Sequence, residues 1–235
     1  MRLSSRSFLI LAFIIRGGFS GLVRVEQPAP SERSAAELAS AVLDALAYAD
    51  AAREKLDQTP ADKDLFAATM TRMTNARIAK RRFQDARALF VNEVKSKRQT
   101  VNLVGTAFTV AFEALEKGCD RGVALDEAIV KAKTQDDIAK IAADGSAIAA
   151  DVDEAWRLLP QGILALSFAL VDEGRLTDGK LQHLRLTSGE RASLISRITR
   201  DYPNVGQQKG GHAIDVSASV LLNFLKGDHK SADAK

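Results

Sequence analysis

Cysteine and histidine are scarce in this 235-residue chain, which contains one cysteine, Cys119, and three histidines. A single cysteine cannot form an internal disulfide, and no neighbouring histidine or cysteine activates it, so we expect Cys119 to be a small buried residue. His183, His212 and His229 are not spaced with other ligands as in His-x-x-x-His or Glu-x-x-His, and we expect them on the surface or in loops. The sequence therefore supports no zinc, di-iron or covalent haem site, and we expect no cofactor.

Proline, glycine and aromatic residues are also few. Five prolines and 15 glycines are too few for a β-sandwich or barrel with a turn about every ten residues. Hydrophobic residues make up 46% of the chain but aromatic residues only 6%, which is typical of helices that pack through small and aliphatic side chains. We predict an all-α fold: an elongated helical bundle built on a long helical hairpin, with a smaller C-terminal helical section.

No hydrophobic run reaches the roughly 20 residues that cross a bilayer. The apolar stretch Phe8–Ile15 follows two arginines and ends at Arg16, which is the layout of a secretory signal, although no Ala-x-Ala cleavage site follows. We predict a signal-peptide-like leader over residues 1–25 and a linker over 26–33. The expected location is periplasmic or secreted, and the alternative is a cytoplasmic protein.

Helical periodicity dominates residues 34–173, the predicted long-helix bundle. Ser34 and Glu37 have the spacing of a capping box, and the helix that follows should end near Asp57, before the break at Thr59-Pro60. No proline occurs over residues 62–116, so we predict one long helix that pairs along its length or bends at Gly105, and that ends at Gly118.

Three further helices complete this predicted bundle. We expect a short helix over residues 125–133, a helix from Thr134 to Pro160 whose apolar stripe includes Trp156 as a core anchor, and a central apolar segment over 163–171. The small residues of the second helix, Ala142, Gly145 and Ala149, should let a partner helix approach closely.

The C-terminal section, residues 174–227, should pack on the bundle. Asp178-Gly179 favours a loop or a small hairpin, followed by a helix from Thr187 to about Asp201 and, after Gly210-Gly211, a final helix from Ala213 to Lys226. Residues 228–235 should be a disordered tail. The inward residues are predicted to be Leu194, Ile195, Ile198, Ile214, Val216, Val220, Leu221, Phe224 and Leu225.

Charge is divided unevenly between two segments. Residues 62–100 contain ten basic and four acidic side chains, a net charge of +6, whereas residues 113–154 contain eleven acidic and five basic ones, a net charge of −6. The simplest interpretation is that these helices are neighbours. The basic run lacks tyrosine, tryptophan and any nucleic-acid-reading pattern, so no nucleic acid is expected. A partner-contact surface is predicted at Arg77, Lys80, Arg81, Arg82 and Arg87.

Catalytic patterns are absent or incomplete. The segment Gly174–Leu181 has phosphate-loop spacing, but Leu181 replaces the hydroxyl residue that ligates magnesium. Gly-x-Ser-x-Gly does not occur, and Asp151, Asp153 and Glu154 should be solvated. We therefore expect no catalytic site.

Three functions remain open on this sequence. The first is a non-catalytic interaction or structural protein, exported, that binds a protein partner or self-associates through its long helices. The second is a membrane-active protein, or one in peripheral membrane contact, because Val101–Phe112 and Leu158–Val171 are the most apolar stretches. The third is a helical enzyme whose site is assembled from scattered residues.

Overall fold

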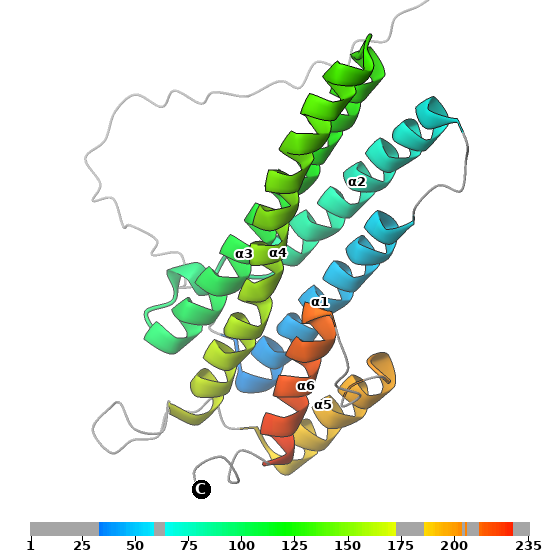
Figure 1. Ribbon diagram of the computed structural model, residues 1–235. Helices are drawn as coiled ribbons and strands as arrows, with labels where there is room; N and C mark the ends of the chain where they lie inside the picture. Colours follow the sequence, from blue (N-terminus) through cyan, green and yellow to red (C-terminus); the bar gives the residue numbers. More distant parts are fainter. Residues whose placement is uncertain (1–32, 59–63, 173–185, 204, 206–211, 228–235) are drawn as a thin grey trace, which may run out of the picture. The chain divides into compact units, whose positions relative to one another are not determined.

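Helices form all the regular structure over the residues that the computed structural model describes, which are 33–58, 64–172, 186–203, 205 and 212–227 (Figure 1). This confirms the all-α prediction. All described residues belong to one compact unit that spans 32–235. The elements are α1 (Ala35–Asp57), α2 (Leu65–Ala88), the short 3-10 helix η1 (Glu93–Lys95), α3 (Gln99–Lys131), α4 (Gln135–Asp172), α5 (Ser188–Asp201) and α6 (Ala213–Lys226).

Several predictions fall on residues outside these ranges. They concern the leader and most of the linker, the break at Thr59-Pro60, the loop or hairpin around Asp178-Gly179, the Gly210-Gly211 loop and the C-terminal tail.

Side-chain caps start three helices where the sequence predicts them. Ser34 Oγ accepts a hydrogen bond from the Glu37 amide at 3.2 Å, and the Glu37 carboxylate accepts one from the Ser34 amide at 2.7 Å. Thr187 and Glu190 form the same capping box before α5. Thr134 caps the amide of Asp137 before α4. Each cap satisfies amide groups that the first helical turn leaves without an intrahelical partner.

The predicted continuous helix over residues 62–116 is wrong. Helix α2 ends at Ala88, the chain turns through η1, and α3 begins at Gln99. Gly105 is not a bend within a helix. A Cβ atom there would lie 2.6 Å from the backbone nitrogen of Val94, so glycine lets the turn pack directly on α3. The turn also brings the Phe90 ring onto that of Phe108, with centroids 4.7 Å apart.

Gly118 does not end a helix either. Helix α3 continues to Lys131, so the short helix predicted over 125–133 is its last part. A Cβ atom at Gly118 would collide with Cγ2 of Val152 in α4, and the glycine therefore permits close approach of the two helices. The long helical hairpin consists of α3 and α4, which lie side by side in Figure 1.

Pro160 lies inside α4 and does not end it, contrary to the prediction. Proline removes one backbone hydrogen bond and costs a helix interior about 3 kcal/mol. The side chains on both sides of Pro160 form one continuous buried face of the helix, and their burial offsets this cost: Leu159, Ile163 and Leu166 are fully buried. The predicted apolar segment over 163–171 is thus the last part of α4.

The stripe of α4 is buried only in part. Trp156 is 8% exposed, which confirms it as a core residue, and its ring lies edge-on to that of Phe83. A Cβ atom at Gly145 would lie 3.8 Å from Cδ2 of Leu125 in α3, so this small residue faces α3, but Ala149 is exposed. The core centre contains stacked phenylalanines from α2, α3 and the turn between them, namely Phe83, Phe90, Phe108 and Phe112.

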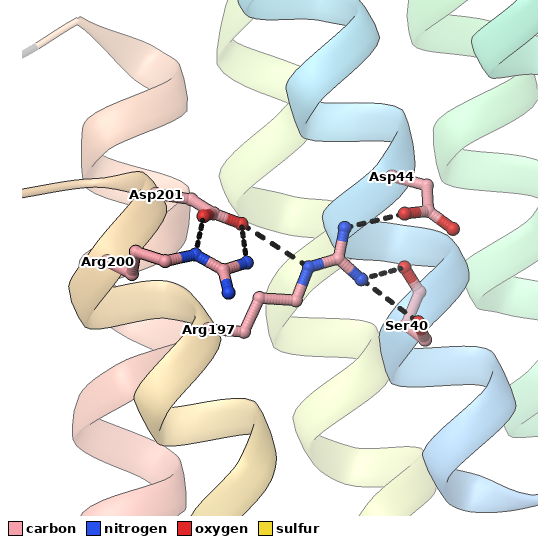
Figure 2. A network of polar contacts seen from close by, with 5 residues as sticks. All are labelled: Ser40, Asp44, Arg197, Arg200 and Asp201. Atoms are coloured by element: carbon pink, nitrogen blue, oxygen red, sulfur yellow. Dashed lines mark hydrogen bonds and ion pairs between the residues drawn. The ribbon is translucent and has the colours of Figure 1, made fainter.

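Helices α5 and α6 pack on one another and on α1, and α6 also packs on α4. Figure 2 shows how Arg197 of α5 reaches α1, where its guanidinium donates to Ser40 Oγ at 3.0 Å and pairs with Asp44. Asp201 accepts from both Arg197 and Arg200. The predicted inward residues of α5 and α6 are buried or partly buried except Val216, which is 42% exposed.

Candidate functional site

The basic helix α2 is a neighbour of α3, which carries five of the eleven acids of the acidic segment, and this part of the charge interpretation is confirmed. The other six acids lie on α4, whose backbone packs along α3 and, over the described residues, not along α2. Helices α2 and α3 are antiparallel, because Arg72 near the start of α2 pairs near the end of α3, whereas Arg87 at the end of α2 pairs in the middle of α3. Four ion pairs join them: Arg72 with Asp126 (2.7 Å), Arg77 with Glu127 (3.6 Å), Lys80 with Asp120 (2.7 Å) and Arg87 with Glu116 (2.7 Å).

The five residues of the predicted partner-contact surface do not gather on one surface. Arg77, Lys80 and Arg87 turn toward α3 and its carboxylates. Arg81 pairs with Asp85 within α2, and Arg82 is exposed. Most of this positive charge is therefore neutralised within the bundle, and partner contact by these residues stays a prediction.

The structure brings the two uncharged stretches of the chain together. No charged residue occurs over 99–112 in α3 or over 158–171 in α4. These stretches run antiparallel, and the Phe108 ring packs so closely on Gly162 that a Cβ atom there would lie 2.8 Å from Cε2. The sequence identified both stretches as apolar, but only the fold shows that they form one two-helix layer.

The outer side of this layer carries four exposed apolar side chains beside the exposed polar residues Gln99, Thr106 and Gln161. The exposed apolar side chains are spaced by seven residues in α3 and by four in α4, and they lie away from the buried side of each helix. Phe108 of α3 packs on Gly162 of α4, and the two helices are antiparallel. Leu103 lies five residues before Phe108, and Phe168 lies six residues after Gly162. Leu103 and Phe168 therefore lie at the same level along the helix pair. We call this surface the apolar face: Leu103 (52% exposed), Val110 (48%), Leu164 (50%) and Phe168 (61%).

Two hollows lie beside the hairpin. One of about 500 Å³ lies between α3 and α4 and is lined by Ala114, Lys117, Asp120, Arg121 and Asp151, of which Arg121 and Asp151 form an ion pair. The other, about 380 Å³, lies between α2 and α3 and is lined by Gln84, Arg87, Ala88, Val91, Val94, Lys95 and Thr109.

Titratable groups also gather where α1, α4 and α6 meet. His212 lies outside the helices, immediately before α6, which agrees with the predicted loop position, but it is half-buried and caps α6 by accepting a hydrogen bond from the Ile214 amide at Nδ1. Burial lowers the pKa of His212, and the Arg53 charge lowers it further. Burial likewise raises the pKa of Tyr202, whose hydroxyl has no hydrogen-bond partner among the described residues. The position of His212 immediately before a predicted helix was the signal for its capping role.

Two further predictions concern Cys119 and the neighbouring carboxylates of α4. Cys119 is 6% exposed, as expected, and burial raises its pKa to about 12, so its thiol is protonated at neutral pH. Asp151, Asp153 and Glu154 are exposed, as predicted.

Within the described ranges, no set of three or more His, Cys, Asp or Glu side chains is arranged to hold a metal ion. None of the helices in this part of the chain is both long and apolar enough to span a bilayer.

The chain matches no protein-family model, and comparison with curated proteins and with solved structures gives no significant match.

Proposed function

We propose that this chain is a non-catalytic protein that self-associates through the apolar face. The observation that carries the proposal is the exposure of Leu103, Val110, Leu164 and Phe168 on two uncharged, antiparallel helix segments. Soluble monomers rarely leave large contiguous apolar surface in water, and such surfaces mark interaction sites. Phenylalanine is favoured at the centre of protein interfaces, whereas charged residues are depleted there.

Charge at the two ends of the face favours a second copy of this chain as the occupant. At one end, residues 95–98 before α3 contribute Lys95, Lys97 and Arg98 and α4 ends in Asp172, a net charge of +2. At the opposite end, residues 113–121 and 151–157 carry six acidic and three basic side chains, and Lys80 and Arg87 of α2 pair with two of the acids, which leaves a net charge of −1. An antiparallel copy would therefore place each positive end beside a negative end.

The spacing of the apolar residues fits the same arrangement. Closed dimers use one surface patch on both subunits, related by a two-fold axis. An axis passing near Ala107 would set Leu103 of one copy opposite Val110 of the other, since these residues lie four positions before and three positions after it. One set of residues would thus supply both sides of the interface.

The test is the mass of the full chain in solution, measured by light scattering over a range of concentrations. We expect a dimer for the unmodified chain and a monomer for Phe168→Glu, with affinity weakened about tenfold or more. Val216→Glu is the matched control, because Val216 is also an exposed apolar residue, but on α6. A monomeric unmodified chain, or a Phe168→Glu variant that remains dimeric, would refute the proposal.

A lipid surface is the competing occupant, and vesicles of phosphatidylcholine and phosphatidylglycerol test it. Self-association predicts little vesicle binding by the dimer and no dye leakage. Binding that abolishes the dimer and disappears in Phe168→Glu would favour membrane activity instead and would count against the proposal.

The same proposal places the chain outside the cytoplasm, on the basis of the basic start and short apolar stretch of residues 1–16. Sequencing the N-terminus of the mature protein tests this part. A new terminus between residues 17 and 33 would support export, and an intact Met1 in the cytoplasm would contradict it.

A further inference from the structure

The first turn of α6, residues 212–216, covers Trp156 of α4 and is less deeply buried than the later turns. His212, immediately before the helix, lies edge-on to the Trp156 indole. Within the turn Ile214 is buried, Asp215 is partly buried and Val216 is exposed. Opening of this turn would therefore expose one buried aliphatic side chain, Ile214, and uncover an edge of Trp156.

The later turns of α6 are anchored by buried leucines. Leu221, Leu222 and Leu225 are buried, and Arg191 of α5 donates a hydrogen bond to the Leu225 carbonyl at 3.1 Å. Exposing each of these leucines would lower the population of an open form by about tenfold or more. Detachment of the whole helix is therefore far rarer than opening of its first turn.

The hydrogen bonds that close the turn require a neutral imidazole. His212 Nδ1 accepts from the Ile214 amide at 3.3 Å, and the His212 carbonyl accepts from the Val216 amide at 3.0 Å. A protonated imidazole carries hydrogen on both nitrogens and cannot accept. The positive end of the helix dipole also disfavours a cation at this position. Both effects favour opening of the turn when His212 gains a proton.

Charged groups from two helices face His212, whereas α4 meets its ring with the uncharged indole of Trp156. These groups are Arg53, Asp50 and Asp57 of α1 and Asp215 of α6. Arg53 is paired with Asp50 at 2.9 Å and with Asp57 at 3.0 Å. Burial first, and then the Arg53 charge, lower the pKa of His212, while the three carboxylates oppose this shift without reversing it. The open turn, with the imidazole in water, thus binds a proton more tightly than the closed turn.

We propose that the first turn of α6 is an acid-sensitive cover, which opens when His212 gains a proton and uncovers Trp156 while the rest of the helix stays on the bundle. The ratio of open to closed turns rises as the pH falls below about 6.5, the ordinary pKa of histidine. One proton raises this ratio by at most about tenfold per pH unit. The rise ends at the lowered pKa of the closed turn.

Amide hydrogen exchange of the full chain, followed by NMR and corrected for intrinsic rates, measures even a small open population. The protection of the Ile214 and Val216 amides should fall about fivefold or more between about pH 7 and about pH 5. It should depend little on low concentrations of urea, because opening of one turn exposes little surface. An unchanged protection, or the same urea dependence as at Leu221 and Leu222, would overturn the proposal.

Variants of the three histidines identify the group that controls the turn. In His212→Asn the protection should be the same at both pH values, because asparagine caps helices but does not titrate in this range. The matched control replaces the other two histidines, as His183→Asn with His229→Asn, and should keep the pH dependence of the unmodified chain. A pH dependence that survives in His212→Asn would overturn the assignment.

Acrylamide quenching of fluorescence tests what the turn uncovers, because Trp156 is the one tryptophan of the chain. The quenching constant should rise between about pH 7 and about pH 5 in the unmodified chain and stay constant in His212→Asn. A constant that does not change in either protein would contradict the uncovering of Trp156. Phe168→Glu should behave like the unmodified chain, since this cover does not depend on self-association.

Discussion

The imidazole of His212 stands edge-on to the indole of Trp156, with ring centroids 4.6 Å apart and an interplanar angle of 76°. The contact joins the start of α6 to the buried face of α4. Because Nδ1 accepts the hydrogen bond of the Ile214 amide, the imidazole is neutral in this arrangement. Protonation would remove this acceptor and place a second positive charge near Arg53.

We predict that His212 makes the fold less stable in mild acid. Its folded-state pKa is lowered, first by burial and then by Arg53, below the value of about 6.5 of an unfolded chain. The contribution is therefore fully present above about pH 6.5 and is lost as the pH falls through the folded-state pKa. Asp215, Asp57 and Asp50 reduce the shift but do not reverse it.

Urea denaturation at about pH 7.5 and about pH 5.5 measures this effect. His212→Asn is the informative variant, because asparagine also caps helices but does not titrate in this range. It should lose less stability between the two pH values than the unmodified chain does. Equal losses in the two proteins would show that other groups cause the pH dependence.

The ion pair between the partly exposed Arg87 and the buried Glu116 gives a second prediction. Glu116 is 7% exposed, and burial raises its pKa while the Arg87 charge opposes that rise. Arg87→Met should destabilise the fold by about 2 kcal/mol, because it leaves a buried carboxylate without its cation. Glu116→Gln in the same chain should restore part of this loss, as a double-mutant cycle would show.

Arg81→Met is the control for this cycle. Arg81 pairs with Asp85 on the surface, where its side chain is 75% exposed, so we expect a change of no more than about 0.5 kcal/mol. A similar loss of stability in both variants would mean that the α2–α3 pair contributes no more than a surface ion pair.

The glycines of α3 give a third prediction. Gly105→Ala should destabilise the fold by roughly 2–4 kcal/mol, since its Cβ atom would meet the backbone of Glu93 and Val94, which cannot move as a side chain can. Gly122→Ala is the control in the same helix, because a Cβ atom there meets nothing within 4 Å. It should stabilise the fold by up to about 1 kcal/mol. Thermal unfolding measures the stability of both variants. If both substitutions stabilised the fold, or both destabilised it, the packing of the turn on α3 would be contradicted.

The sequence predicted the features that depend on neighbouring residues. Ser34 and Thr187 mark helix starts because a cap and its partner lie three residues apart. The charge segments predicted that α2 and α3 are neighbours, because opposite net charge favours contact.

Features that depend on distant residues could not be predicted in this way. Gly105 and Gly118 look like helix breaks in the sequence, whereas in the structure they allow close contacts with Val94 and Val152. The prediction that Pro160 ends a helix is wrong because burial of the residues around it outweighs the helix-breaking effect of proline. The apolar face requires the register of α3 against α4, which no single helix specifies.

The last prediction concerns Cys119, which lies near the middle of α3 and is 6% exposed. Burial first, and then the charge of Asp120, raise its pKa from 9.0 to about 12, and Lys80 only partly opposes this. Near pH 8 the thiolate fraction of Cys119 should be about a thousandfold lower than that of an unperturbed cysteine, because the pKa is raised by about three units.

Reaction of Cys119 with a thiol reagent such as dithionitrobenzoate should therefore be very slow in the native protein and rapid in urea. In moderate urea its rate should follow the unfolding equilibrium, because the thiol becomes accessible only when α3 separates from its neighbours. Rapid native reaction that is independent of urea would show that α3 and α4 separate locally, and the apolar face could then not act as a preformed surface.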